Sequence, residues 1–341
     1  MNSLHLFAGS KRVIVKFKDV TRTDLVKQAG GIVENEFKIF RGVSAIIPDE
    51  RISLLSRHPA IEYIEEDRIV YAVGKPGPQQ PPQTTPWGIS KINAPQSWAL
   101  STGYNANVCV VDSGIQLDHP DLVDNIGWNV TFVTGTKNGN DDNGHGTHVA
   151  GTIAAVKVLN KSGSGYTSWV IKGIEWCVAN GMDVINLSLG SETYSQSEEN
   201  AIKAAYNAGL VIVVAAGNDA QTGNNLQYPA IFPEVLAVAA TDSANNVASF
   251  SSHGYWVDIA APGVQIYSTA KGSTYTTKNG TSMATPHVSG GAAVLLAYNP
   301  ALTNAEVYSK LTSTATDLGD AGWDEYFGWG LLDLYAAVTA P

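Results

Sequence analysis

The sequence predicts a two-part α/β protein: a doubly wound, mostly parallel sheet preceded by a small α+β module of the ferredoxin-like type. Three observations lead to this prediction. Four strongly apolar runs in the second part alternate with helical stretches, a pattern typical of parallel strands covered by helices on both faces. A Pro-rich stretch separates the two parts. Before it, the elements follow the order β-α-β-β-α-β.

The first part, residues 1–73, alternates between the strand period and the helix period. The expected strands cover residues 13–17, 32–40, 43–47 and 61–71. The expected helices cover residues 23–28 and 49–58, and Asp49 is expected to cap the second helix. Residues 74–86 then hold five Pro and two Gly in thirteen residues, which predicts an extended linker.

The second part, residues 87–341, is expected to form the doubly wound domain. The expected strands cover residues 107–111, 183–188, 210–215 and 235–240, and the expected helices cover 167–180, 196–208 and 282–298. Ligands of such sheets bind at the carboxyl ends of the strands. The residues that follow these strands are therefore the first candidates for a functional site.

Composition narrows the class of protein. Of the 341 residues, 44% are hydrophobic and 15% charged, which excludes a disordered chain, and no apolar run approaches the length of a membrane span. Residues 1–73 hold 11 Lys and Arg against 10 Asp and Glu, while the remaining residues hold 10 against 21. Such an acidic main body argues against nucleic acid as a partner.

Two further features concern the compartment. Cys109 and Cys177 cannot make a disulfide framework, and each has apolar neighbours, so we expect two separate small core residues. The first residues lack the basic and apolar regions of a signal peptide. Either the protein is not exported, or a leader has been removed and Met1 added.

Three segments together suggest nucleophilic catalysis. Asp112 ends an apolar strand, His145 stands between glycines at the start of a helix, and Ser282 heads a long helix of small residues. Alone, each has a plain structural interpretation as a cap, a turn residue or a polar core residue. Together they supply an acid, a base and a nucleophile: a serine hydroxyl needs a base to take its proton, and the base needs an acid to orient it.

The same segments carry a resemblance to a known family. Residues 111–115 (VDSGI), 145–152 (HGTHVAGT) and 280–288 (GTSMATPHV) resemble, in the same order, the three signatures of the subtilisin-like serine proteases. The match runs through most of residues 86–340. The resemblance implies a subtilisin-like fold and a serine endopeptidase that works through an acyl-enzyme, with protein or peptide substrates.

The resemblance also implies roles for single residues. Asp112 would orient His145, His145 would be the general base and then acid, and Ser282 would attack the peptide carbonyl. Asn218 matches the amide of the oxyanion hole. His148 and His287 are the other histidines of these motifs and are not triad members.

Substrate binding is implied by further segments. Two of them resemble the edges that clamp an extended peptide, and a third resembles the wall of the first side-chain pocket. The residues are Gly163, Ser164, Gly165, Ser188, Leu189, Gly190, Ala215, Ala216 and Gly217. Gln227, where many relatives carry Gly, would shorten this pocket, and Asp219 beside it would weakly favour cationic side chains.

Residues 11–73 resemble the inhibitory propeptide of the family. The resemblance implies a domain of residues 1–73 that aids folding and inhibits in cis, with cleavage between Val73 and Gly74. The remaining segments would be a linker and mature N-terminus at 74–86 and a catalytic domain at 87–341. Residues 74–88 look most like the entry segment of subtilisins from hyperthermophilic archaea. We expect a secreted monomer, with an intracellular location as the alternative.

One region departs from the family. The helix that begins at His145 is expected to run to Ala155 and to meet a strand at Val156 without any turn residue. Relatives carry a calcium-binding loop there, whose remaining ligands match Gln83 and Asp121. Either that calcium site has been deleted or residues are missing from the sequence, and the turnless junction favours missing residues. Residues 138–142 form an acidic loop that is able to hold calcium, or a plain solvated loop.

Two other classes of function stay open at this stage. One is a catalytically silent protease fold that serves as a peptide-binding or scaffold protein. The other is a different serine hydrolase, but this would require a G-x-S-x-G elbow, and the residues around Ser282 lack it.

Overall fold

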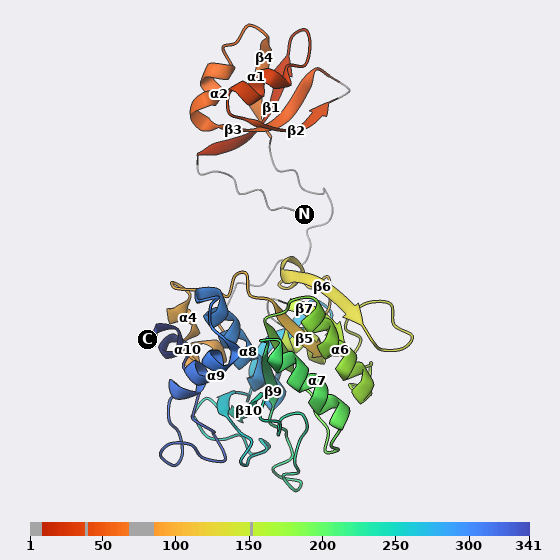
Figure 1. The fold of residues 1–341 in the computed structure, drawn as a ribbon, viewed down its shortest axis with the longest axis vertical. Helices are drawn as coiled ribbons and strands as arrows, with labels where there is room; N and C mark the ends of the chain where they lie inside the picture. Colours follow the sequence, from red (N-terminus) through yellow and green to blue (C-terminus); the bar gives the residue numbers. More distant parts are fainter. Residues whose placement is uncertain (1–8, 38–39, 68–84, 151–152) are drawn as a thin grey trace. The chain divides into compact units, whose positions relative to one another are not determined.

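The computed structural model describes residues 9–37, 40–67, 85–150 and 153–341 (Figure 1). The chain divides into two compact units, Met1–Gln79 and Gln80–Pro341, and the division falls within the Pro-rich stretch. In the described part of the chain, no helix is long and apolar enough to cross a membrane.

The N-terminal unit is a four-stranded antiparallel sheet with two helices, in the predicted order β-α-β-β-α-β. Its elements are β1 (Ser10–Phe17), α1 (Thr23–Gln28), β2 (Ile32–Phe37), β3 (Gly42–Pro48), α2 (Asp49–Leu55) and β4 (Ile61–Glu66), with the sheet order β2-β3-β1-β4. Val13, Val15 and Phe17 alternate along β1 and join one buried core. The predicted cap of α2 is wrong: Pro48 is the N-cap residue, and Asp49 lies inside the first turn.

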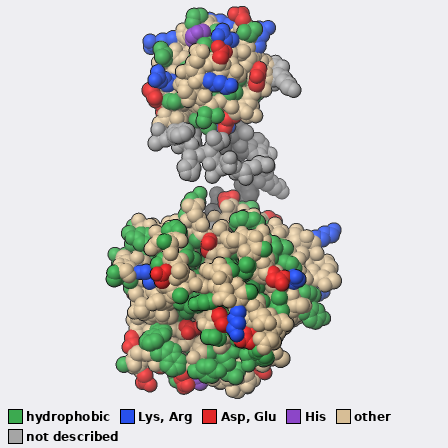
Figure 2. Space-filling view, viewed as in Figure 1, with side chains coloured by type: hydrophobic (Ala, Val, Ile, Leu, Met, Phe, Trp, Pro, Cys, Tyr) green, Lys and Arg blue, Asp and Glu red, His purple; other side chains and the backbone are tan. Residues whose placement is uncertain are grey.

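Charged side chains are mixed on the surface of this unit. Figure 2 shows Lys and Arg scattered among Asp and Glu on the face that is drawn. This agrees with the nearly balanced charge of residues 1–73.

The C-terminal unit is built on a seven-stranded parallel sheet, as the apolar runs predicted. Its order is β11-β10-β9-β8-β5-β7-β6. The strands are β5 (Val108–Asp112), β6 (Ile126–Thr131), β7 (Ile153–Lys157), β8 (Val184–Leu187), β9 (Val211–Ala215), β10 (Leu236–Thr241) and β11 (Ile259–Pro262); a separate hairpin pairs β12 (Ile266–Ala270) with β13 (Thr274–Lys278).

Helices cover both faces of this sheet (Figure 1). The helices are α3 (Trp87–Lys91), α4 (Ala94–Ser97), α5 (His145–Val149), α6 (Thr167–Ala179), α7 (Gln196–Asn207), α8 (Thr281–Tyr298), α9 (Asn304–Ser313) and α10 (Leu334–Thr339), with a short 3-10 helix at Val123–Asn125. Val108 and Val110 of β5 join the core beneath α8, whereas Cys109 and Val111 join the core beneath α6 and α7. The strand period of two thus explains why every residue of β5 is buried.

The predicted helix from His145 to Ala155 is wrong. Helix α5 ends at Val149, and β7 begins at Ile153. Ala155 and Val156 pair with consecutive residues of β5 and lie within one continuous strand, so the turnless helix–strand junction that favoured missing residues is not present. Small apolar residues suit either conformation, and pairing with β5 and β6 on both sides selects the strand.

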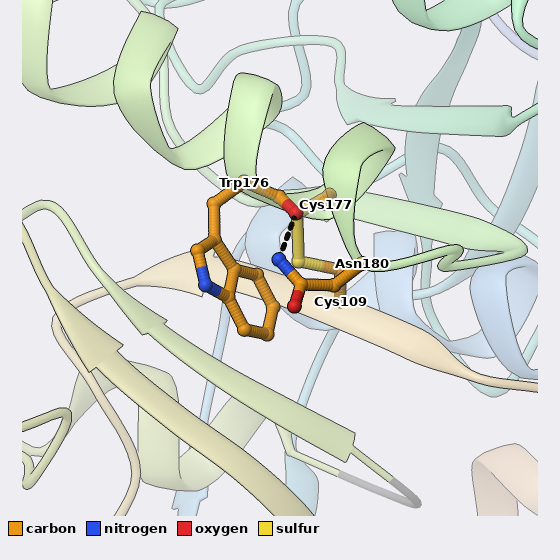
Figure 3. The surroundings of a disulfide bond; sticks show 4 residues. All are labelled: Cys109, Trp176, Cys177 and Asn180. Atoms are coloured by element: carbon orange, nitrogen blue, oxygen red, sulfur yellow. Dashed lines mark hydrogen bonds between the residues drawn. A yellow bond between two sulfur atoms is a disulfide. The ribbon is translucent and has the colours of Figure 1, made fainter.

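Both cysteines are core residues, as predicted, but they also form a disulfide that the prediction did not include (Figure 3). Cys109 lies in β5 and Cys177 in α6, and both are fully buried. Beside them, the side-chain amide of Asn180 donates to the Trp176 carbonyl at 2.8 Å at the end of α6. The bond therefore ties the strand that ends at Asp112 to the helix that covers it.

Loss of the disulfide should lower the free energy of unfolding. The cysteines are 68 residues apart, and constraint of a loop of this size in the unfolded chain is worth about 4 kcal/mol in the chain-entropy model. The double variant Cys109→Ala/Cys177→Ala should therefore unfold at lower denaturant concentration, by about 2–4 kcal/mol. As a control, a reductant should lower the free energy of unfolding of the wild type and leave that of the variant unchanged. Equal stability of the two proteins would contradict this account.

Candidate active site

The predicted catalytic residues follow strands that end at one edge of the parallel sheet. Asp112 is the last residue of β5, and Asn218 lies three residues after the end of β9. Ser188 comes directly after β8, and its hydroxyl donates to the Ser282 carbonyl at 3.0 Å in the first turn of α8. Parallel pairing therefore brings together residues that lie far apart in the sequence.

Asp112 and His145 form a close pair. The Nδ1 atom of His145 lies 2.9 Å from both carboxylate oxygens of Asp112, which is fully buried. The Ser113 amide also donates to Asp112 at 2.6 Å. Gly146 follows the histidine, and a Cβ there would collide with the Gly114 carbonyl, so only glycine permits this approach.

The charges around His145 shift its pKa. The negative charge of Asp112 raises the pKa of His145 above its usual value, although burial of the ring opposes this. Lys278 also opposes protonation by its positive charge, and its Nζ donates to the Gly144 carbonyl at 3.0 Å, one residue before the histidine. The Asp112 carboxylate thus holds the imidazole in place and raises its pKa, while the Lys278 ammonium group lowers that pKa.

Asp141 organises the loop that leads to His145. Its Oδ1 accepts from the Ser113 hydroxyl at 2.9 Å and from the amides of Asn143 and Gly144 at 2.9 and 2.8 Å. Its Oδ2 accepts from the amide and the hydroxyl of Thr147 at 3.0 and 2.6 Å. Burial acts to raise the pKa of Asp141, but the bonds from Thr147 and Gly144 outweigh it and lower the pKa. Both oxygens serve protein donors, so Asp141 is a structural residue of this loop.

Sequence reasoning missed the role of Lys157. Its side chain is fully buried, and Nζ donates to the carbonyls of Ser113 and Leu159 at 2.6 and 2.8 Å and to Asp142 at 2.6 Å. Burial of a lysine costs free energy unless its charge is paired. A Lys within an apolar strand was therefore the sequence feature that could have indicated a buried, paired ammonium group. It fixes the backbone one residue beyond Asp112.

Ser282 and Asn218 meet at the start of α8. Asn218 Oδ1 accepts from the amide and the hydroxyl of Thr281 at 2.9 and 3.2 Å, which leaves its Nδ2 as the donor end. The Ser282 hydroxyl donates to the Ser188 carbonyl at 3.2 Å. Among the described residues no hydrogen bond joins Ser282 to His145. Such bonds often tighten only when substrate is present.

The residues predicted for the first substrate pocket come together around Gln227. The side chain of Gln227 is buried, and its Nε2 donates to Asp219 at 2.6 Å. A Cβ at Gly217 would lie 2.7 Å from Gln227 Cγ, and one at Gly190 would lie 3.2 Å from Gln227 Oε1. Ala215 and Ala216, the rest of the predicted wall, are buried where β9 ends.

The other predicted edge, Gly163 to Gly165, lies in the connection from β7 to α6. A Cβ at Gly163 would lie 3.3 Å from the Asn143 amide nitrogen, and Asn143 in turn donates to the Lys161 carbonyl at 3.1 Å. At Gly165 a Cβ would collide with the Val158 carbonyl. This segment therefore adjoins the loop before His145, whereas Gly190 adjoins Gln227 and Leu189 packs against the core beneath α6 and α7.

Of the two predicted calcium ligands, the structure describes only Asp121. Gln83 lies outside the described residues, as do Val73 and Gly74 of the predicted cleavage site. Asp121 Oδ2 accepts from the Tyr275 hydroxyl at 2.7 Å. Within the described ranges, no group of three or more His, Cys, Asp or Glu side chains is placed to hold a metal ion.

Comparison with known proteins places this geometry in a family. The model of the subtilase family, peptidase family S8, matches residues 103–330. Subtilisin E of Bacillus subtilis strain 168 is 41% identical over 352 aligned positions, which cover 97% of this chain and 89% of the relative. Subtilisin of Bacillus pumilus is 47% identical, covering 75% of this chain and 99% of the relative, and an alkaline protease of Alkalihalobacillus alcalophilus is 42% identical, covering 89% and 81%.

The parallel sheet places an acid, a histidine and a serine near one edge, which is the arrangement expected of a hydrolytic enzyme of the serine type. The chain belongs to the subtilase family and is a subtilisin-like serine endopeptidase. The alignment with subtilisin E spans more positions than the 341 residues of this chain, so the relative carries residues that this chain lacks. The relatives named here are bacterial, and the likeness of residues 74–88 to archaeal subtilisins stays a prediction.

Replacement of Lys278 by glutamine should raise the pKa of His145 further. Glutamine keeps a donor for the Gly144 carbonyl but removes the positive charge that opposes protonation of the ring. An NMR titration of the His145 imidazole measures the shift directly. Lys172→Gln, on the exposed face of α6, is the matched control and should leave the titration unchanged. An unchanged or lower pKa in Lys278→Gln would contradict this assignment.

Proposed function

We propose that this endopeptidase cleaves peptide bonds through an acyl-enzyme, with Ser282 as nucleophile, His145 as general base and then acid, and Asp112 as the orienting group. The observation that carries the proposal is the buried Asp112 carboxylate, whose two oxygens both lie 2.9 Å from His145 Nδ1. This bond fixes the tautomer that leaves Nε2 as the acceptor for a serine proton. Acylation of Ser282 releases the amine, which His145 protonates, and water then releases the acid.

The developing negative charge needs donors at the start of α8. Asn218 is held by its carbonyl end against Thr281, so that its Nδ2 hydrogens serve the oxyanion together with the Ser282 backbone amide. The N-terminus of this long helix adds favourable partial positive charge. The arrangement acts mainly in the transition state, because a planar carbonyl carries less charge.

The substrate is an extended peptide bound between the segments at 163–165 and 188–190. The bond from Gln227 to Asp219 supports a short and polar first pocket, because the glutamine side chain occupies the space next to Gly217 and Gly190. Such a pocket favours small or polar side chains, with a weak preference for positive charge at Asp219.

The N-terminal unit serves this enzyme as a folding aid and an inhibitor in cis. Its own sheet and hydrophobic core support an independent domain of residues 1–73, to be removed at the bond between Val73 and Gly74. The mature protein would be a secreted monomer. The alternative is a catalytically silent protein that uses the same fold to bind peptides without cutting them. The intact pair of Asp112 and His145 argues against this alternative.

A structural calcium ion held by Gln83 and Asp121 completes this proposal. Gln83 lies outside the described residues, and Asp121 Oδ2 accepts from the Tyr275 hydroxyl at 2.7 Å. Calcium binds carbonyl and amide oxygens as well as carboxylates, so backbone groups would supply the other ligands of such a site.

The decisive experiment is Ser282→Ala in the full chain. We expect no hydrolysis of a denatured protein substrate and no labelling by an organophosphonate, whereas Ser309→Ala on exposed α9 should behave as the wild type. Measurement before and after removal of residues 1–73 separates inhibition by that segment from a silent active site. Retained turnover in Ser282→Ala would overturn the assignment, and absence of labelling in the trimmed wild type would favour the silent protein.

Asn218→Leu should lower kcat far more than it raises KM, because the amide acts mainly in the transition state. The loss measured for such a donor in a subtilisin is on the order of 10²–10³, and we expect the same direction here. Asn180→Leu, at the C-cap of α6, provides the control and should change neither constant. An effect on KM alone would exclude the oxyanion role.

A further inference from the structure

The buried ammonium group of Lys157 joins separate segments of the chain at one point. Lys157 is the last residue of β7 and pairs in register with Asp112, the last residue of β5. Its Nζ donates to the Ser113 carbonyl at 2.6 Å, to Asp142 Oδ1 at 2.6 Å and to the Leu159 carbonyl at 2.8 Å. A lysine ammonium has three hydrogens, so these acceptors use all of them.

Two of the acceptors flank the pair of Asp112 and His145. Ser113 directly follows Asp112, and Asp142 lies three residues before His145. The backbone over such short spans has few free dihedrals, so a shift of either acceptor also shifts its neighbour in the pair. Lys157 therefore holds both members of the pair relative to one fixed point.

The third acceptor leads into the segment at 163–165 that is proposed to bind substrate. A closed turn follows Leu159. In this turn the Asn160 amide donates to the Ser164 carbonyl at 2.8 Å, and the Gly163 amide donates to the Asn160 carbonyl at 2.9 Å. These bonds connect the substrate-binding edge to Leu159 within a few residues. The ammonium group therefore contacts the base of this edge as well as both sides of the pair.

Packing alone does not require a lysine at this position. The residues before it in β7, at 153–156, are all apolar, and the Lys157 side chain is fully buried. Burial of an ammonium group costs free energy that only close partners offset. An apolar side chain of similar length would fill the same space but would remove the donor from the carbonyls of Ser113 and Leu159. The charge therefore serves the junction itself rather than the core.

We propose that Lys157 is a positioning residue that couples binding of an extended peptide at 163–165 to the geometry of Asp112 and His145. This role rests on the proposed function. A peptide that pairs with the edge holds Leu159 in place, and the shared ammonium group then holds the segments that carry the pair. Binding energy from the distant part of the peptide is thereby used to orient the reacting groups, which raises kcat and not only affinity.

The test compares two peptide amides that differ only in length. The short one has a single residue before the scissile bond, and the long one adds three residues that reach the edge at 163–165. In the wild type, kcat should be higher for the long substrate. In Lys157→Met this gain in kcat should be roughly 2- to 30-fold smaller, the range expected for coupling through a network of side chains, while the gain in affinity remains. A loss of packing alone would lower kcat for both substrates by the same factor.

Asp142 provides a matched pair of variants. Its side chain is 43% exposed, so replacement does not disturb the core. Asp142→Asn keeps an oxygen acceptor for the ammonium group and should retain most of the gain in kcat, whereas Asp142→Ala removes this acceptor and should lose part of it. If Lys157→Met does not fold, this pair of variants decides.

The outcomes separate this role from the proposed function. All proteins are expressed as the full chain and measured before and after removal of residues 1–73. Absence of hydrolysis in the trimmed wild type would overturn the proposed function and the coupling with it. Hydrolysis with a kcat that does not rise with substrate length, or with an equal rise in the wild type and Lys157→Met, would overturn the coupling alone, as would the same rise in Asp142→Ala as in Asp142→Asn.

Discussion

The geometry at the sheet edge that carries Asp112 depends on buried charges, each of which needs partners of opposite charge or hydrogen-bonding groups. Asp112 and Lys157 are fully buried, and Asp141 is nearly so. In this setting an unpaired charge would cost several kcal/mol, so each group has to be surrounded by partners. Asp112 has His145 and a backbone amide, Asp141 has five donors, and Lys157 has three acceptors. Because most of these partners lie just after β5 or around the start of α5, satisfying the charges also sets the position of His145.

Much of the fold was predictable because the local hydrophobic pattern and the long-range strand pairing favour the same secondary structure. The runs that form β5, β8, β9 and β10 are apolar on both faces, and only a covered parallel sheet buries them completely. The prediction failed where they disagree: residues 150–155 read as a continuation of α5, yet β5 and β6 offer two partners to a strand at Ile153–Lys157. The prediction missed the disulfide for a related reason, since the apolar neighbours of each cysteine give no sign that β5 and α6 pack against each other at Cys109 and Cys177 within one core.

For the site, the motifs identified the residues expected to react but not those that hold them. Asp112, His145 and Ser282 were found because their residue types and positions suggest nucleophilic chemistry, and Asn218 because its segment resembles that of the family. Asp141 was interpreted as part of a solvated or calcium-binding loop, and Lys157 as an ordinary strand residue. Their roles arise from donors and acceptors distributed from Ser113 to Leu159, and no pattern within a short window reveals such a network.

The disulfide has a consequence for the integrity of a protease among other proteases. It closes a covalent ring of the chain that runs from Cys109 to Cys177 and contains both His145 and the segment at 163–165. A single cut anywhere inside that ring leaves the two pieces joined through sulfur. Nicked molecules would migrate as intact ones until they are reduced, and the fragment with Asp112 could not diffuse away from the fragment with Ser282. A cut within this stretch therefore breaks one peptide bond without releasing a fragment of the protein.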